Sequence, residues 1–184
     1  MGLEIERRFL VAGEGWRSHV LWKRRLQQGY LSSQSDGLTL RVRITRAHHQ
    51  QASAWLTIKA PPTQLIGQHP DGLIRQEFEY PIPIEDAEAL LCMAPHQVCK
   101  WRHGLDLAGG DWVLDVFDGP NAPLVVAEVE LADARQAVSV PPWCVLELTG
   151  RHELSNAALA CKPFVSWPDA PRALLLQALE TTAG

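Results

Sequence analysis

The sequence predicts a mainly β protein of the α+β class, with antiparallel strands in a barrel or sandwich and a few helices. The first observation is a two-residue alternation of apolar and polar residues, which recurs in short runs along most of the 184 residues. The second is turn chemistry between these runs, as at Asp36-Gly37, Gly109-Gly110 and Pro141-Pro142. The third is the small number of segments with helical periodicity. Eight or nine such strands can close a barrel.

The individual elements follow from the same patterns, taken in chain order. The expected strands are Leu3 to Val11, Arg25 to Leu31, Leu38 to Thr45, Ala54 to Ala60, Leu73 to Pro81, Val98 to His103, Asp111 to Asp118, Leu124 to Ala132 and Val145 to Thr149. The expected helices are Glu14 to Leu21, Glu85 to Met93, Asn156 to Ala160 and Ala170 to Thr181. Acids in the first turn favour the second helix, and leucines give the last one an apolar face to pack on the body or a partner.

Composition excludes several classes of protein. With 46% apolar and 21% charged residues, the chain is typical of a globular protein. A net charge of -4 gives no basic field for nucleic acid or an anionic membrane. The longest apolar stretch, Ala89 to Ala94, is far short of the ~20 residues of a spanning helix, and MGLEIERRFLV has no apolar signal core. We therefore expect a cytoplasmic protein. The four cysteines form no C-x-x-C pair, which argues against redox or zinc chemistry.

Charged residues gather on the polar faces of the predicted strands. Because residues two apart in a strand point to the same side, each E-x-E, R-x-R or K-x-R motif places two like charges about 7 Å apart on one face. The motifs are Glu4 with Glu6, Arg41 with Arg43, Glu77 with Glu79, Lys100 with Arg102, and Glu128 with Glu130; Arg8, Lys59, Asp115 and Glu147 are further charges on such faces.

Like charges repel, so this concentration favours a ligand that counters them. Carboxylate pairs suit a hard divalent cation, and basic pairs suit phosphates, which Arg binds in a two-pronged way. Both kinds together predict a metal-bound polyphosphate. This interpretation requires charged faces that point into a barrel lumen, with the apolar faces covered outside by helices and the C-terminal segment. The competing interpretation is a β-sandwich interaction domain, in which each motif belongs to a solvated strand face with ion pairs of about 0.2 to 1 kcal/mol.

The segment Glu4-Ile5-Glu6-Arg7-Arg8 closely resembles the E-x-E-x-K signature of the CYTH family, the triphosphate tunnel metalloenzymes. The resemblance continues in the family's order over roughly residues 3 to 167. Its further motifs are Gln28-Gly29-Tyr30-Leu31, Leu40-Arg41-Val42-Arg43-Ile44, Leu56-Thr57-Ile58-Lys59, Glu77-Phe78-Glu79-Tyr80, Lys100-Trp101-Arg102, Trp112 to Phe117, Val125 to Leu131, Pro141-Pro142-Trp143 and Glu147-Leu148-Thr149-Gly150. We therefore expect one tunnel domain over residues 1–167, with residues 168–184 as its C-terminal helical extension.

The resemblance implies an eight-stranded antiparallel β-barrel tunnel, whose charged lumen binds triphosphate and Mg²⁺ or Mn²⁺, with a few helices packed outside. The implied substrate-binding residues are Arg8, Arg41, Arg43, Lys59, Lys100 and Arg102. The implied metal ligands are Glu4, Glu6, Asp115, Glu128 and Glu130, with Glu77, Glu79 and Glu147 as ancillary lumen acids. Arg8, Glu4 and Glu6 are the implied catalytic residues. Arg8 stands where the signature has Lys, and Val113 and Val116 stand where relatives often carry acids.

The resemblance implies a metal-dependent hydrolase that cleaves inorganic triphosphate to pyrophosphate and phosphate. Thiamine triphosphatase and adenylate cyclase are alternatives within the family, and a non-catalytic polyphosphate- or nucleotide-binding module is an alternative outside enzymes. The expected partner is inorganic triphosphate or a small molecule that bears a triphosphate, with neither nucleic acid nor membrane. The sequence leaves a homodimer open.

Overall fold

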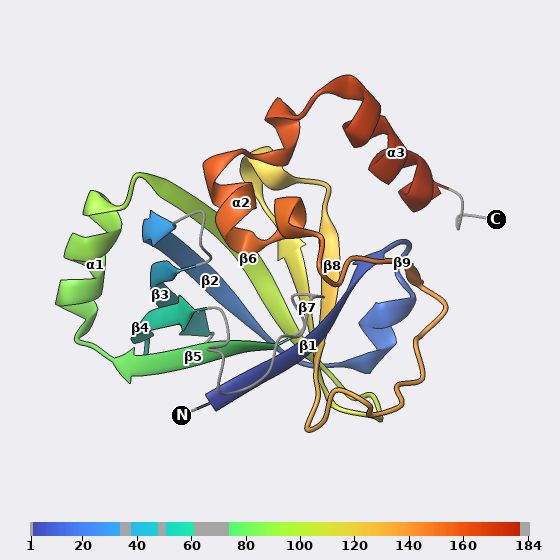
Figure 1. Ribbon diagram of the computed structural model, residues 1–184, viewed down its shortest axis with the longest axis horizontal. Helices are drawn as coiled ribbons and strands as arrows, with labels where there is room; N and C mark the ends of the chain where they lie inside the picture. The colour runs from blue at the N-terminus through green and yellow to red at the C-terminus, as the bar shows by residue number, and fades with distance from the viewer. Residues whose placement is uncertain (1, 34–37, 48–50, 61–73, 181–184) are drawn as a thin grey trace.

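One curved antiparallel sheet forms most of the computed structural model (Figure 1). The structure describes residues 2–33, 38–47, 51–60 and 74–180, with backbone alone for 2–4, 33, 74 and 75. The strands are β1 (Gly2–Val11), β2 (Val20–Ser33), β3 (Thr39–Ala47), β4 (Ser53–Ala60), β5 (Ile74–Pro81), β6 (His96–Leu105), β7 (Asp111–Phe117), β8 (Val125–Glu130) and β9 (Cys144–Glu147). The predicted mainly β, antiparallel class is confirmed.

Three α-helices and four 3-10 helices accompany the sheet in the described ranges. The α-helices are α1 (Ile84–Met93), α2 (Asn156–Cys161) and α3 (Asp169–Glu180), and the 3-10 helices are η1 (Gly15–His19), η3 (Gly119–Asn121), η4 (His152–Leu154) and η5 (Phe164–Ser166). The α-helices lie close to their predicted positions. The segment expected as a helix from Glu14 to Leu21 is instead the short η1, because β2 already begins at Val20. Among the described residues, no helix combines the length and apolar character needed to cross a membrane.

The strand order brings the two ends of the sheet toward each other. The order is β5-β4-β3-β2-β6-β7-β8-β1-β9, and β5 also pairs with β1 over four residue pairs, from Gly2 with Glu77 to Ile5 with Ile74. The described chain has nine strands, as the alternation predicts. The family resemblance implies eight, and the ninth strand, β9, adds to β1 at the end of the order. Figure 1 shows the resulting curl, in which β5 runs toward β1. Closure into a complete tunnel stays a prediction.

Apolar side chains on the convex face of the sheet are covered by helices and loops. Val42 and Ile44 of β3 pack with Ala87 and Leu91 of α1. Gly29 of β2 lies under the same helix, where a Cβ atom would stand 2.7 Å from the Cβ of Ala94. Strands β1, β7 and β8 carry a second apolar cluster, covered by Trp16 of η1 and by Trp143. Because alternate residues point to opposite faces, Arg41 and Arg43 of β3 lie on the concave face, which we call the inner face.

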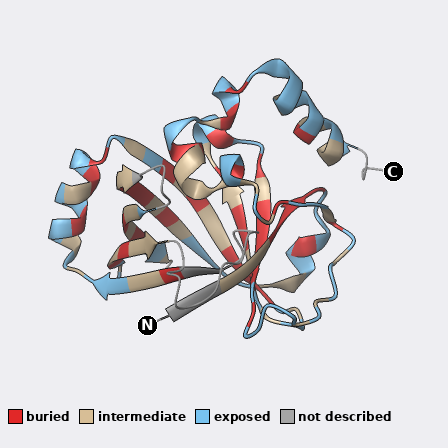
Figure 2. Cartoon of the chain, in the orientation of Figure 1, coloured by how far each residue is buried: buried red, intermediate tan, exposed pale blue. Residues whose placement is uncertain are grey.

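The C-terminal segment covers one end of the inner face. Leu10, Val98, Phe117 and Val126 each lie two residues from a charged residue of the same strand, and they pack with Leu154 of η4 and other residues of this segment. The other members from the segment include Leu159 of α2, Phe164 of η5, Trp167 and Leu175 of α3. The inner face is therefore charged along part of its length and apolar at the end under α2. The sequence predicts that this segment covers outward apolar faces, but it packs on the inner face. Figure 2 shows buried stretches along the segment.

Candidate functional site

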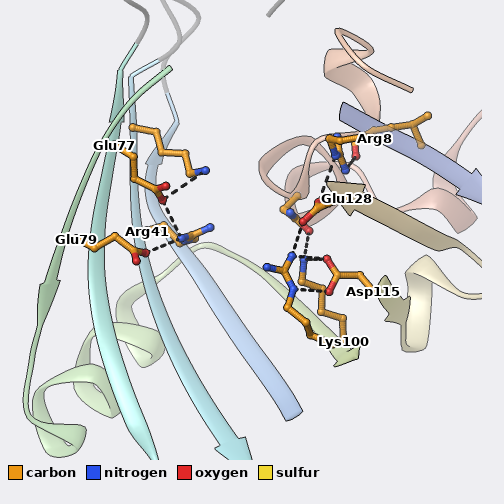
Figure 3. A network of polar contacts seen from close by, with 11 residues as sticks. Arg8, Arg41, Glu77, Glu79, Lys100, Asp115 and Glu128 are labelled. Atoms are coloured by element: carbon orange, nitrogen blue, oxygen red, sulfur yellow. Dashed lines mark hydrogen bonds and ion pairs between the residues drawn. The ribbon is translucent and has the colours of Figure 1, made fainter. Parts of the chain in front are cut away.

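The charged residues of the inner face form two clusters that face each other across the concave side of the sheet (Figure 3). The first cluster consists of Arg8, Lys100, Arg102, Asp115 and Glu128, from β1, β6, β7 and β8. The second consists of Arg41, Arg43, Thr57, Lys59, Glu77 and Glu79, from β3, β4 and β5. Strand pairing brings the members of each cluster together. In the first cluster Arg102 lies directly opposite Asp115, and in the second Arg41 lies directly opposite Thr57.

The first cluster is a buried chain of ion pairs. Lys100 Nζ lies 2.5 Å from Asp115 Oδ2, and both residues are fully buried. Arg102 donates from Nε to Asp115 Oδ1 at 2.7 Å and from Nη2 to Glu128 Oε2 at 2.5 Å. Arg8 donates from Nε to Glu128 Oε1 at 3.2 Å and from Nη2 to the carbonyl oxygen of Leu154 at 3.0 Å. The C-terminal segment thus contacts the charged part of the inner face directly.

The second cluster is more accessible and is organised around Glu79. Arg43 Nη2 donates to both carboxylate oxygens of Glu79, at 3.1 and 3.3 Å. Arg41 Nη2 donates to Glu79 Oε1 at 3.2 Å and to Thr57 Oγ1 at 3.0 Å. Lys59 Nζ lies 3.4 Å from Glu77 Oε1. Three cations therefore share two carboxylates, which leaves a net positive charge in this cluster.

Burial and neighbouring charges shift the pKa values of these groups. Burial lowers the pKa of Lys100 to about 8, although Asp115 beside it acts in the opposite direction. Burial, together with the nearby charge of Arg41, lowers the pKa of Arg43 to about 10. Burial would raise the pKa of Glu128, but Arg102, Lys100 and Arg8 lower it well below its ordinary value. Perturbed groups gathered on one concave face are typical of a functional site.

Three buried polar atoms of the inner face have no hydrogen-bond partner in the described structure. They are Nε of Arg41, Nε of Arg43 and Oε1 of Gln28. Gln28 of β2 lies directly opposite Arg43 of β3, so these atoms come from adjacent strands. Since a buried unsatisfied donor or acceptor costs about 1–3 kcal/mol, this part of the face has the character of a ligand site.

Carboxylates on β1, β7 and β8 have the chemistry of a divalent-cation site. Glu6 of β1 lies directly opposite Glu130 of β8, and Glu128 is the next residue on that side of β8. Like charges directly opposite each other are destabilising, and a cation between them would offset this. Oxygen ligands alone suit Mg²⁺ or Mn²⁺. Among the described residues, no three acids or other metal-binding side chains converge into a ready-made site. The carboxylates on these strands therefore have the chemistry that such an ion requires. In this structure Asp115 and Glu128 pair with basic side chains.

The structure places most of the predicted site residues on the inner face. Glu147 does not lie there: it is exposed on β9 and accepts hydrogen bonds from Arg7 at 2.9 and 2.8 Å, so its prediction as a lumen acid is wrong. Arg7 lies on the opposite face of β1 from Arg8. Glu6 and Glu130 take part in interactions of their own, and Glu6 lies close enough to Arg102 to affect its pKa. The side chain of Glu4 lies outside the described residues.

Sequence reasoning missed three residues of the site. Thr57 of β4, which contacts Arg41 and Glu79, shares a strand face with Lys59. Gln28 lies two residues from Leu26 and from Tyr30 and shares their strand face, so the period of two could have placed it. Asn156 accepts a hydrogen bond from Lys100 Nζ at 2.8 Å. No local pattern predicts that contact, because it depends on how α2 packs across the sheet.

Comparisons with known proteins find a matching family model and similar proteins with names. The family model for the CYTH domain matches residues 2–157. The chain is 32% identical over 175 residues to a protein of Acetivibrio thermocellus named inorganic triphosphatase, covering 92% of this chain and 100% of that protein. A protein of Nitrosomonas europaea with the same name is 36% identical over 161 residues, covering 85% and 96%. A crystal structure of an inorganic triphosphatase superposes with a TM-score of 0.58 at 33% identity, covering 91% of this chain and 98% of that one.

Proposed function

The chain belongs to the CYTH domain family, and from this premise we propose that it is a metal-dependent hydrolase that cleaves inorganic triphosphate to pyrophosphate and phosphate. The observation that carries the proposal is the gathering of six basic side chains and their carboxylate partners on one concave face. Buried charges are expensive and rarely improve stability over apolar residues, so their presence favours a ligand-binding role. The names of the two relatives point to the same substrate.

The basic side chains would hold the triphosphate within the predicted tunnel. Arg41 and Arg43 have Nε donors without partners, and these match phosphate oxygens, which accept charge-assisted hydrogen bonds. Lys59, Lys100 and Arg102 would neutralise the remaining charge from the neighbouring strands. Arg8, in the position of the signature Lys, is positioned by Glu128 and Leu154. The substrate would replace part of the carboxylate contacts that these cations now make.

The carboxylates would hold Mg²⁺ or Mn²⁺ beside the triphosphate. The residues that we assign to this role are Glu4, Glu6, Asp115, Glu128 and Glu130, with Glu77 and Glu79 as neighbouring acids. When bound, the ion would neutralise charge on the phosphate oxygens and polarise them as a Lewis acid. Carboxylates that now pair with Arg8 and Arg102 could turn to the ion as these cations turn to the substrate.

Positioning and electrostatics would supply most of the rate enhancement. In phosphoryl transfer the charge spreads over the oxygens of the transferred group, and fixed cations that contact these oxygens lower the barrier. The first cluster supplies such cations close together, because Lys100 and Arg102 both contact the buried Asp115. A water molecule attacks the terminal phosphorus, and pyrophosphate leaves.

Phosphate release by the purified protein tests the proposal. Inorganic triphosphate, ATP and thiamine triphosphate are each supplied with Mg²⁺, with Mn²⁺ or with EDTA. The proposal predicts metal-dependent release that favours inorganic triphosphate. A preference for thiamine triphosphate would identify that compound as the substrate in place of inorganic triphosphate. Formation of cyclic AMP from ATP would indicate a cyclase. Tight binding of any of these compounds without turnover would indicate a binding module.

A further inference from the structure

The inner face carries a buried side-chain amide, that of Gln28, to which the proposed function assigns no role. Gln28 of β2 has Arg43 of β3 and Val98 of β6 directly opposite on its two sides. Gln28 is only 1% exposed, and its Oε1 atom accepts no hydrogen bond in the described structure. Since an unsatisfied buried acceptor is costly, we expect a molecule that donates a hydrogen bond to Oε1 when the site is filled.

The neighbours of Gln28 identify that molecule. Arg41 Nε and Arg43 Nε, which also lack partners, are donors and therefore match phosphate oxygens. Oε1 of Gln28 is an acceptor, and an ionised phosphate oxygen has no hydrogen to donate to it. A water molecule next to the phosphate can donate to Oε1. The carboxylate of Glu79, which Arg43 contacts, is already engaged by Arg41, Arg43 and Thr57, whereas Oε1 of Gln28 has no donor in the described structure.

We propose that Gln28 is a catalytic residue that orients the water molecule attacking the triphosphate, an inference that rests on the proposed function. Oε1 accepts a hydrogen bond from the water, whose oxygen then faces the terminal phosphorus. The water oxygen forms a bond to this phosphorus, and the bond from phosphorus to the bridging oxygen breaks. Its electron pair leaves with pyrophosphate. One hydrogen of the water stays on the phosphate released, and the other passes to solvent as a proton. An uncharged amide performs this task with less repulsion of the polyanion than a carboxylate would cause.

The test compares three variants in steady-state hydrolysis of inorganic triphosphate with Mg²⁺. Gln28→Met keeps the length of the side chain but removes the acceptor, and we expect kcat to fall by about 10²-fold with KM within twofold of wild type. Gln28→Glu keeps an acceptor oxygen, and we expect its kcat to be about tenfold higher than that of Gln28→Met. We expect its KM to be raised, because the charge of the carboxylate repels the substrate. Gln27→Met is the matched control: Gln27 lies on the opposite face of the same strand, bonded to Gln97, and its kcat should be unchanged.

Each other outcome separates this inference from the proposed function. If Gln28→Met retains wild-type kcat, or changes KM alone, Gln28 does not orient the attacking water. An equal loss in Gln28→Met and Gln28→Glu would assign it a purely structural role. Thermal unfolding of each variant checks the fold, and if Gln28→Met does not fold, Gln28→Asn, which withdraws the amide by one methylene, is interpreted by the same criteria. If the wild-type protein hydrolyses no triphosphate, the proposed function fails and this assignment fails with it.

Discussion

Arg43 offers a direct test of substrate binding by a single side chain. Its Nη2 contacts Glu79, its Nε has no partner in the described structure, and it belongs to the less buried cluster, where a ligand has access. We expect Arg43→Ala to lower kcat for inorganic triphosphate by about 10² to 10³-fold, as the loss of one donor to a transition-state oxygen does elsewhere. The measurement is the rate of phosphate release at saturating substrate.

Arg46→Ala is the matched control for this prediction. Arg46 lies on the same strand but on the convex face, where Nη2 contacts Glu88 of α1 at 3.2 Å. Its removal should leave kcat unchanged and alter stability by no more than about 1 kcal/mol, as is usual for an exposed ion pair. Wild-type turnover in Arg43→Ala, or an equal loss in both variants, would contradict the assigned role.

Glu79 should give the stability of the protein a defined dependence on pH. Burial would raise its pKa, but Arg43, Thr57 and Arg41 lower it below the ordinary value of 4.5. Its contribution to stability is therefore complete above the pKa of the unfolded state and is lost as pH falls through the lower pKa of the folded state. We expect Glu79→Gln to be less stable than wild type at pH 7 in urea unfolding, with the difference shrinking below about pH 4. A difference that is constant with pH would contradict this.

At the scale of elements, the contact between α1 and β2 depends on Gly29. A Cβ atom at this position would stand 2.7 Å from Ala94 Cβ and 2.8 Å from Leu91 Cδ2, closer than packed side chains allow. Gly29→Ala should therefore push the end of α1 away from the sheet and destabilise the protein by about 1–3 kcal/mol. Urea unfolding measures this loss, and Gln27→Ala on the same face of β2 serves as control. An unchanged unfolding midpoint in Gly29→Ala would show that the helix end moves without cost.

The elements also show which features a sequence pattern can predict. Alternation identified every strand, although it predicted β2 only from Arg25 to Leu31 where the structure has Val20–Ser33. It also showed that Arg41 and Arg43 share a face opposite Val42 and Ile44, because a strand has a fixed period. Alternation within a strand does not show which other element of the fold packs on each face of that strand. Contacts across the fold, such as that of Lys100 with Asn156, depend on packing between distant segments. Glu147 was misplaced for the same reason: its strand adds to the edge of β1, and its polar side chain meets Arg7 instead of the inner face.

For the whole molecule, the balance of charge on the inner face determines how triphosphate can bind. The sequence assigns six basic residues to this face and seven acidic ones, once Glu147 is excluded, so acids exceed bases by one. A highly charged anion gains little from such a face unless cations accompany it. The described acids of the first cluster are already paired with Lys100, Arg102 and Arg8, so we expect the fold not to depend on the metal.

We therefore predict that triphosphate stabilises the protein only together with a divalent cation. At a triphosphate concentration of 100 times Kd, binding to the native state alone contributes about 2.7 kcal/mol, which for a chain of this size raises the unfolding temperature by roughly 5–10 °C. Thermal unfolding with triphosphate and Mg²⁺ should show this increase, whereas triphosphate with EDTA, or EDTA alone, should leave the unfolding temperature unchanged. Arg43→Ala, which removes a substrate contact, should show a smaller increase under the same conditions. An equal increase with EDTA would mean that the basic residues bind triphosphate unaided, and the carboxylates would then need another explanation.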